Sequence, residues 1–462
     1  MLAWAAITVG VVARVFSLVV RPLWADEIFT LTVARKSASE ILAALRVDSG
    51  PPLHYVFAHV LLAPFGPAPG LPDVLVRVLS LVASLLHLPL LFVVARRLGR
   101  PEMGLPAAAL YSVFPLAVAY AAEGRAYALA SLLALLAFER ALALRERPRP
   151  LTALGLTLAA AGAVLTHYLA VFPVAALAIL ALDARPAARH ALVLSGLAAA
   201  ALAATWVPIA LAQPHASMAW SMEAGFASAL RDFPANLAFG APAGGPVMTA
   251  LGVAGALLLA ALFARAWRGA FSPVARVLGL SLALLALAEL GAGTLVLPER
   301  TALVFLPFAV LLLAAAPPFV PAAAGTLATA LLALWLPRAV EPSPGALLAR
   351  LLEAPARAGR RVLAAGYWGP ELDYRLARAG APGRVVLFPS AVAAHPGWYR
   401  EEEISDVRLA AEADVALAAS RPPTIFVLPR GSRASNALAS RLGHARRLLS
   451  SPLVDVVETR GP

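Results

Sequence analysis

Long apolar runs separated by short polar segments fill the chain up to residue 337. About eleven of these runs approach the length of about 20 residues that an α-helix needs to cross a bilayer. The runs lie near residues 2–20, 74–95, 104–121, 126–144, 151–166, 168–182, 191–212, 246–264, 275–291, 301–316 and 319–337. The pattern therefore predicts a mainly α, polytopic membrane protein with about eleven transmembrane helices.

The first run, at 2–20, contains one charged residue, Arg14. It lacks the basic segment that opens a secretory signal. The residues after it, Pro22-Leu23-Trp24-Ala25, make a poor cleavage site. We therefore expect this run to remain as the first membrane span.

Arginines gather in every second loop between the runs. They follow the second, fourth, sixth and eighth runs, at residues 96, 97, 100, 145, 147, 149, 185, 189, 265, 268 and 276. Positive residues collect in the cytoplasmic loops of membrane proteins. The C-terminal tail and the alternate loops are then expected to face outward, the loops being 21–73, 122–125, 166–168, 213–245 and 292–300.

The character of the chain changes after Pro337, where charge density rises and Pro342, Pro344 and Gly345 indicate a linker. Short runs with β propensity follow at 361–364, 384–388 and 424–428, alternating with helix-like stretches near 371–379, 404–419 and 432–443. Alternation of this kind is typical of a small α/β domain with a parallel sheet. We expect a membrane domain over residues 1–338 and a soluble α/β domain over residues 339–462.

Composition agrees with a membrane location, since 61% of the residues are hydrophobic and 14% are charged. Mean hydropathy is +0.79. A soluble domain is roughly 45–50% apolar and about 25% charged. The net charge of +12 would suit nucleic acid, but the arginines lie in clusters between apolar runs, so no nucleic-acid partner is expected. The chain has no cysteine, which excludes disulfides, thiolate catalysis and cysteine metal sites.

Two adjacent carboxylates, Asp26 and Glu27, follow the first span directly. A carboxylate at a membrane boundary can be shielded from water and still reach a polar substrate, which is the setting that a general base needs. Adjacent acids are also typical of the first turn of a helix, where they interact with the helix dipole. Local chemistry therefore leaves a catalytic base and a helix cap both open.

Other polar groups lie in loops of the same predicted face or at the span ends beside them. They are residue types that bind phosphate or sugar, namely His54, Tyr55, Arg77, Glu123, Arg125, Tyr127, His167, Tyr168 and Arg300. Each alone can be a snorkelling side chain, a tight polar turn or a membrane-boundary anchor. Because they come from separate loops on one face, we expect a shared cavity to gather them.

These groups occur in an ordered set of motifs. The set is Trp24-x-Asp26-Glu27, Gly50-Pro51-Pro52-Leu53-His54-Tyr55, Arg77-x-x-Ser80, Glu123-Gly124-Arg125-x-Tyr127 and Thr166-His167-Tyr168. Over roughly residues 1–310 it resembles the C-type glycosyltransferases of the protein O-mannosyltransferase superfamily (glycosyltransferase family 39), whose bacterial branch includes the aminoarabinose transferase that modifies lipid A. One departure is Glu299-Arg300-Thr301, where the family pattern has Arg-Tyr.

The resemblance implies a glycosyltransferase in the inner membrane of a bacterium, with its active site and C-terminal domain outside the cytoplasm. The donor would be a sugar on a polyprenyl phosphate, and the acceptor an envelope lipid, glycan or protein. Asp26 would deprotonate the acceptor hydroxyl, which attacks the anomeric carbon with inversion, while Glu27 supports it. Arg125, Arg77 and Arg300 would neutralise the departing lipid phosphate.

A divalent metal near Asp26 is a further possibility, because some relatives bind one near the acidic loop. Asp26, Glu27, Glu123 and the histidines offer suitable ligands, although their spacing requires no metal. No cofactor follows with certainty from the sequence.

Two other functional classes remain open. A polytopic transporter or lipid flippase would place ionisable groups near the bilayer midplane and would show repeated halves. Here the polar groups gather at one face, and no repeat is visible. A non-catalytic envelope scaffold would leave those outer groups without a role. The glycosyltransferase is the favoured interpretation, and the transporter is the alternative.

Overall fold

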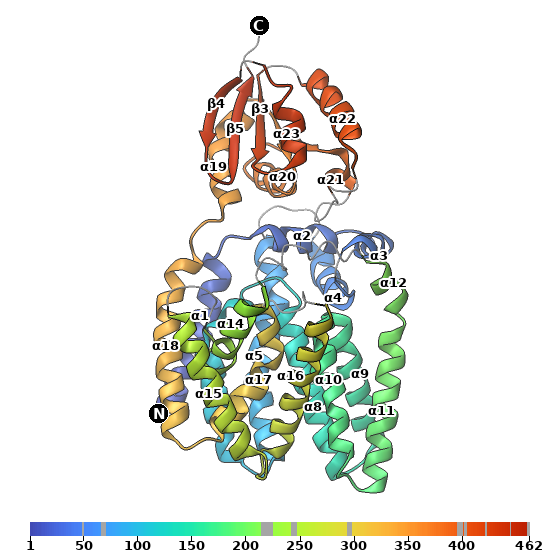
Figure 1. The fold of residues 1–462 in the computed structure, drawn as a ribbon, viewed down its shortest axis with the longest axis vertical. Helices are drawn as coiled ribbons and strands as arrows, with labels where there is room; N and C mark the ends of the chain where they lie inside the picture. Colours follow the sequence, from blue (N-terminus) through green and yellow to red (C-terminus); the bar gives the residue numbers. More distant parts are fainter. Residues whose placement is uncertain are drawn as a thin grey trace. The chain divides into compact units, whose positions relative to one another are not determined.

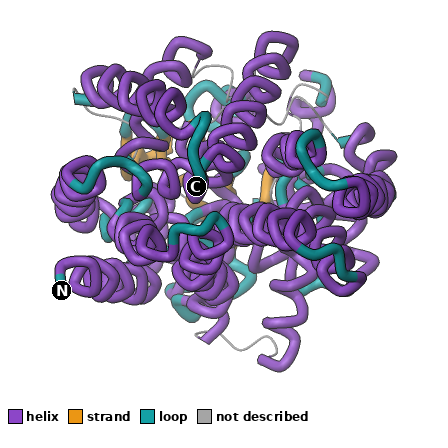
Figure 2. Tube along the Cα trace, turned by 90° about the horizontal axis from the view of Figure 1, so that it is seen from below, coloured by secondary structure: helices purple, strands orange, loops and turns teal. Residues whose placement is uncertain are grey.

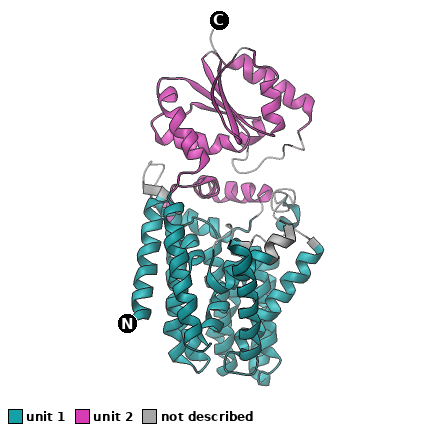
Figure 3. Ribbon diagram, turned by 60° about the vertical axis from the view of Figure 1, so that its left-hand side comes forward, with its two compact units in different colours: residues 1–21, 49–60, 74–340 teal, residues 22–48, 61–73, 341–462 magenta. Residues whose placement is uncertain are grey.

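The computed structural model describes residues 1–48, 50–65, 71–213, 225–241, 247–292, 298–394, 401, 404–420, 423–443 and 445–459. They form two compact units, coloured separately in Figure 3. The helical unit consists of residues 1–21, 49–60 and 74–340, and the α/β unit consists of residues 22–48, 61–73 and 341–462. The division after Val340 lies close to the predicted boundary, whereas the segment 22–48 groups with the α/β unit.

Helices, most of them long, run side by side in the helical unit (Figure 1), and Figure 2 views them from below. They are α1 (Leu2–Val20), α4 (Leu53–Leu62), α5 (Leu71–Arg97), α6 (Gly104–Val113), α7 (Pro115–Ala121), α8 (Tyr127–Glu146), α9 (Pro150–Thr166), α10 (Val171–Ala176), α11 (Pro186–Ala204), α12 (Val207–Ala212), α14 (Gly225–Phe239), α15 (Met248–Ala266), α16 (Ser272–Ala292), α17 (Pro298–Ala314) and α18 (Phe319–Ala339). Short 3₁₀ segments flank α10, at Tyr168–Ala170 and Leu177–Ala181. One large apolar core includes Phe114, Phe138 and Phe305.

Every one of the predicted spans falls on helical structure. Within the described residues, seven helices are long and apolar enough to cross a membrane, and the bent pair α6–α7 makes an eighth. The other expected spans lie on shorter helices: α9 and α17 have 17 residues each, and the third covers Tyr168–Ala181. The expectation of a mainly α, polytopic membrane fold is confirmed. In the expected outer loop 213–245, α14 is described, while residues 214–224 and 242–246 lie outside the described part.

A break between α6 and α7 bends that span by 67°. Pro115 begins α7 and has no backbone N–H, so the carbonyl of Tyr111 loses its helical partner. The N–H of Leu116 donates to another segment, which leaves the carbonyl of Ser112 as well. Arg14, buried in α1, replaces both partners: its Nη2 lies 3.0 Å from the Tyr111 oxygen and its Nη1 lies 2.5 Å from the Ser112 oxygen. The one charged residue of the first span therefore stabilises a helix break.

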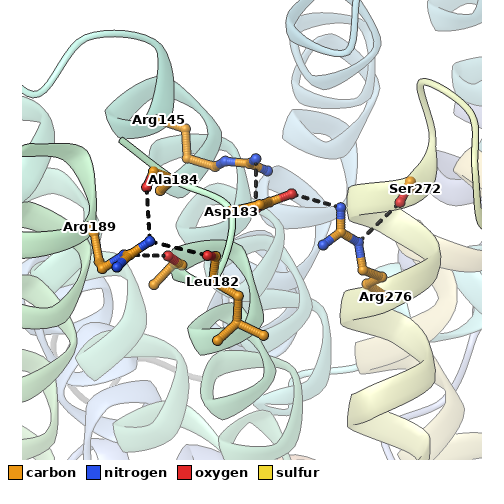
Figure 4. Close-up of polar contacts among 8 residues, drawn as sticks. Arg145, Leu182, Asp183, Ala184, Arg189, Ser272 and Arg276 are labelled. Atoms are coloured by element: carbon orange, nitrogen blue, oxygen red, sulfur yellow. Dashed lines mark hydrogen bonds and ion pairs between the residues drawn. The ribbon is translucent and has the colours of Figure 1, made fainter. Parts of the chain in front are cut away.

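Three of the basic loops meet at one end of the helical unit (Figure 4). Asp183 accepts hydrogen bonds from Arg145 and from Arg276, each at 2.9 Å. Arg189 donates nearby to the carbonyls that end the preceding helix, including that of Leu182 at 3.2 Å. Because the 20 residues of α8 span about 30 Å, Tyr127 at its start lies at the opposite end from these arginines.

The α/β unit contains a five-stranded sheet in the order β2-β1-β3-β5-β4. Its strands are β1 (Arg361–Ala365), β2 (Val385–Phe388), β3 (Thr424–Pro429), β4 (Ala445–Ser450) and β5 (Val454–Thr459). The first three are parallel, and β4 and β5 add an antiparallel hairpin at one edge. Its helices are α2 (Ala25–Ala34), α3 (Ala38–Val47), α19 (Pro344–Arg357), α20 (Trp368–Arg378), α21 (Ser390–Ala394), α22 (Asp406–Ala419) and α23 (Arg433–Ala439).

Helices cover both faces of this sheet, because successive side chains of each strand point to opposite faces and apolar ones lie on both. On one face, Leu352 of α19 and Leu372 of α20 pack with Val362 of β1. On the other, Leu409 of α22 and Leu438 of α23 are in the cluster that includes Leu363, the next residue of β1. The predicted α/β domain and its parallel strands are confirmed.

The β4–β5 hairpin and α19 were not predicted from the sequence. Arg446 and Arg447 are adjacent and mostly exposed on β4, and a register shift follows them, so β4 lacks clean alternation. The expected linker at 342–345 is the start of α19, because the Ser343 hydroxyl accepts a hydrogen bond from the Ala346 N–H at 3.1 Å and Pro344 occupies the first helical position.

Candidate active site

The site residues predicted from the sequence divide between the two units. Nine lie in the helical unit: His54, Tyr55, Arg77, Glu123, Arg125, Tyr127, His167, Tyr168 and Arg300. Asp26 and Glu27 lie in the α/β unit, in the first turn of α2.

Tyr127, at the start of α8, joins three other segments of the helical unit. The guanidinium of Arg300 lies over its ring, 5.8 Å from the centroid. The ring of His167 lies 5.0 Å away and that of Tyr120, in α7, lies 5.1 Å away in an edge-to-face arrangement. An arginine held over an aromatic face keeps its charge available while its position is restrained. Two of the predicted outer loops, through His167 and Arg300, therefore converge on one aromatic side chain.

Arg125 lies in the tight turn that precedes α8. The turn is closed by a hydrogen bond from the Arg125 N–H to the Glu123 carbonyl at 2.8 Å, and the Ser80 hydroxyl donates to the Arg125 carbonyl at 3.0 Å. The side chain of Arg125 donates from Nη1 to the hydroxyl of Tyr55 at 3.3 Å. A Cβ on Gly124 would lie 2.9 Å from a methyl group of Val76, so this turn requires glycine.

The two histidines of the site are held in their neutral form. Burial lowers the pKa of His54 to about 3, and the positive charge of Arg125 acts in the same direction. Burial, with Arg125 and Arg300, lowers the pKa of His167 to about 4. The Nδ1 atom of His167 accepts a hydrogen bond from the Leu169 N–H at 3.2 Å, so its neutral ring carries the proton on Nε2. Near neutral pH these rings act as polar neutral groups rather than as cations.

Arg77 has a structural role that the sequence did not indicate. Its Nη1 donates to the carbonyls of Leu18 at 3.1 Å and Arg21 at 2.7 Å, at the end of α1. The last carbonyls of a helix have no partner within the helix, and a cation there is favourable. This buried arginine therefore caps α1.

Tyr168 belongs to a hydrogen-bonded group that includes two residues missed in the sequence. Its hydroxyl donates to Gln213 Oε1 at 2.6 Å and accepts from the indole nitrogen of Trp206 at 2.9 Å. Gln213 also donates from Nε2 to the Gly50 carbonyl at 3.0 Å. The group ties the turn before α4 to the end of α12. A polar residue directly after an apolar helix was the only sequence signal for Gln213.

The two acidic residues of α2 differ in their surroundings. Glu27 is fully buried, and its Oε2 accepts a hydrogen bond from the Trp24 N–H at 3.3 Å, as in a capping box. Asp26 is only partly buried. The helix-cap interpretation therefore applies to Glu27, while Asp26 is the more accessible carboxylate.

Within the described part of the chain, no group of three or more histidine, aspartate or glutamate side chains is placed to hold a metal ion. Residues 49–209 match the family described as dolichyl-phosphate-mannose-protein mannosyltransferase. No curated protein matches the chain by sequence.

Solved structures give a match over nearly the whole chain. The crystal structure of ArnT from Cupriavidus metallidurans bound to undecaprenyl phosphate has a TM-score of 0.55 at 15% identity, covering 99% of this chain and 98% of that one. This chain has the C-type glycosyltransferase fold. The apo state of the same ArnT gives a TM-score of 0.51 at 15% identity, with the same coverage of both chains.

A weaker match lies outside the ArnT structures. The Archaeoglobus fulgidus oligosaccharyltransferase tethered with an acceptor peptide has a TM-score of 0.49 at 10% identity, covering 98% of this chain and 74% of that one, which is too low to add to the assignment. The ArnT match and the family match together confirm the resemblance to the C-type glycosyltransferases.

Proposed function

We propose that this protein is a membrane glycosyltransferase that moves a sugar from a polyprenyl-phosphate carrier to a lipid, glycan or protein acceptor of the cell envelope. The observation that supports this most is the convergence of Arg125, Arg300 and two neutral histidines at one end of a helical unit with the C-type glycosyltransferase fold. The ArnT structure of the same fold is bound to undecaprenyl phosphate.

In this proposal Arg125 and Arg300 bind the lipid phosphate. Guanidinium groups pair with phosphate oxygens through two parallel hydrogen bonds, and such charge-assisted bonds are stronger than neutral ones. Both side chains are restrained, Arg125 by Tyr55 and Arg300 by Tyr127, which lowers the entropy lost on binding. Arg77 contributes indirectly, because it holds the end of α1.

Asp26 is the proposed general base. It takes the proton of the acceptor hydroxyl while that oxygen forms a bond to the anomeric carbon of the sugar. The bond from that carbon to the phosphate oxygen breaks, and its electron pair leaves with the lipid phosphate, whose charge the arginines neutralise. Attack opposite to the leaving group inverts the anomeric configuration. Glu27 supports the loop, since its carboxylate already accepts the Trp24 N–H.

His54, His167, Glu123 and Tyr168 complete the site in supporting roles. A neutral imidazole can donate a hydrogen bond to a sugar hydroxyl or a phosphate without adding a second positive charge. Tyr168 fixes the turn that leads into α4, which carries His54 and Tyr55.

The rival interpretation, a transporter, has less support. Buried ionisable residues inside the described spans, such as Arg14 and His87, have protein partners: Arg14 donates to backbone carbonyls, and His87 contacts the Ala83 carbonyl at 2.8 Å and the Ser131 hydroxyl at 3.1 Å. Groups engaged in this way brace helices and leave no midplane cluster for a solute among the described residues.

Reconstituted protein provides the test. Lipid bilayers would contain the wild type, polyprenyl-phosphate sugars of different kinds and an extract of envelope lipids and glycans as the source of acceptor hydroxyls. Acceptor-dependent release of polyprenyl phosphate would be measured. Asp26→Asn should reduce transfer by several orders of magnitude. Glu40→Gln, which changes an exposed capping carboxylate of the same loop, should transfer normally. Equal activity of Asp26→Asn and wild type would exclude Asp26 as the base.

Two cellular experiments complement this assay. Mass spectrometry of envelope lipids and glycans with and without the gene would identify the sugar and the acceptor together.

The proposed location, a bacterial inner membrane with the C-terminal domain outside, is tested with single cysteines, since the native chain has none. A membrane-impermeant maleimide should label Leu453→Cys in cells with a permeable outer layer but should not label Arg147→Cys, in an expected cytoplasmic loop, although both positions are exposed.

A further inference from the structure

An arginine of the C-terminal domain holds the backbone directly before the acidic loop. Within the α/β unit, α20 packs against α2. Nη2 of Arg375, in α20, donates a hydrogen bond to the carbonyl oxygen of Leu23, although 352 positions separate the two residues in the sequence. Leu23 precedes Trp24, the N-cap of the helix whose first turn carries Asp26.

The guanidinium of Arg375 is itself fixed by a small polar network. Its Nε donates to Oε1 of Glu371 at 2.8 Å, and its Nη2 also lies 3.3 Å from the Ser343 hydroxyl. The Ser343 hydroxyl donates to the same Glu371 oxygen at 3.1 Å. The side chains of Arg375 and Glu371 are 16% and 9% exposed, so solvent competes weakly for these bonds.

The backbone of α19 approaches this network closely at Gly345. A Cβ built on Gly345 would lie 2.3 Å from the Glu371 carboxylate, so any other residue at this position would displace that carboxylate. Glu371 therefore lies between α19 and Arg375, where its carboxylate accepts hydrogen bonds from Ser343 and from the Arg375 guanidinium. Such a support is stiffer than a single surface ion pair, which contributes little by itself.

We propose that Arg375 is a positioning residue for Asp26, and that through the Leu23 carbonyl the C-terminal domain sets the orientation of the acidic loop. The inference rests on the proposed function of Asp26. Glu27 holds the N-cap from within α2, and Arg375 holds the chain just before it, so the first turn is fixed on both sides. The C-terminal domain then supports the reaction without contacting the substrate.

The expected effect follows from how sensitive catalysis is to geometry. A displacement of about 1 Å in a reacting group can reduce the rate by about 10²-fold. Arg375→Gln should therefore lower kcat by roughly 10- to 100-fold, while the Kd for polyprenyl phosphate alone stays unchanged. The kcat of Arg375→Lys should lie between those of Arg375→Gln and the wild type. An ammonium group can reach the Leu23 carbonyl but lacks the forked geometry that lets a guanidinium bind Glu371 as well.

A matched control is available in α22. Arg408 and Glu412 form an ion pair with the same i,i+4 spacing at 2.9 Å, on an exposed surface of the same domain. Arg408→Gln removes a comparable pair and should leave kcat at the wild-type value. If Arg375→Gln and Arg408→Gln have the same kcat, Arg375 has no positioning role.

A second measurement does not depend on activity. Because the chain has no cysteine, a spin label on Ala25→Cys, an exposed position beside Asp26, reports the mobility of the loop in the full-length protein. Arg375→Gln should increase the mobility of the label, and Arg408→Gln should not. Unchanged mobility would overturn the inference even if transfer is lost. Absence of transfer by the wild type, with increased mobility in Arg375→Gln, would instead contradict the proposed function.

Discussion

Arg125 and Tyr55, which lie 70 positions apart in the sequence, are joined by a hydrogen bond of 3.3 Å from the guanidinium to the phenol. The bond connects the turn before α8 to α4. It gives the two residues unequal roles, because the guanidinium supplies the charge and the phenol only orients it.

Substitution of Arg125 should therefore be more severe than substitution of Tyr55. A hydrogen bond to a charged group contributes about 1.5–3 kcal/mol, so Arg125→Gln should weaken binding of polyprenyl phosphate by roughly 10- to 100-fold. Tyr55→Phe removes only the hydroxyl and should cost less than about 10-fold. Titration of both variants with the lipid checks this, and equal losses would contradict the assignment of Arg125 to the phosphate.

The neutral histidines predict a loss of stability in mild acid. The pKa values of His54 and His167 are lowered to about 3 and about 4, below the usual value of 6.5. Between these limits the unfolded chain binds protons that the folded chain does not, so the free energy of unfolding decreases as pH falls from about 6.5 toward about 4. Thermal unfolding, followed by tryptophan fluorescence, should show this slope, and it should be smaller in His54→Asn and His167→Asn. A flat profile would contradict burial of neutral rings.

Tyr168 should matter for stability more than for chemistry. Tyr168→Phe leaves Gln213 and Trp206 without the shared hydroxyl, and an unsatisfied buried polar group costs about 1–3 kcal/mol. We expect a lower melting temperature with transfer reduced only in proportion to the folded fraction. A normal melting temperature with abolished transfer would place the hydroxyl in the chemistry instead.

Arg14→Met should strongly destabilise the helical unit. It removes the partner that the Tyr111 and Ser112 carbonyls share in a membrane span, and each buried carbonyl left unsatisfied costs about 1–3 kcal/mol. Arg14→Lys, which can reach one carbonyl, should be intermediate. Thermal unfolding of the purified proteins measures the order of their stabilities. A wild-type melting temperature for Arg14→Met would show that the helix break needs no cap.

Hydropathy predicted the membrane fold well, because a bilayer imposes one length and one polarity on every span. It also placed Arg125, His167 and Arg300 at one end, since loop order alone determines which end a residue occupies. The contacts among these residues could not be predicted from the order of the loops. Only packing decides that Arg300 and His167 both lie against Tyr127, or that Arg77 bonds the end of α1.

Pairings between distant segments were the part that the sequence could not supply. Arg14 was visible only as an interruption, because its partners lie 97 and 98 positions away. The grouping of α2 with the C-terminal domain had no local signal either, since one arginine–carbonyl bond such as that of Arg375 with Leu23 leaves no periodic pattern. Whether Asp26 performs the chemistry stays a prediction.

The cap that Arg14 places on the break before Pro115 also has an evolutionary consequence. Each residue offsets a cost of the other: without the break the arginine would lose the Tyr111 and Ser112 carbonyls as partners, and the proline without the arginine would leave those carbonyls bare. Across an alignment of homologues the two positions should change together, with lineages that lose the proline also losing the arginine. Independent variation of the two positions would indicate that other residues can also cap the carbonyls at the helix break.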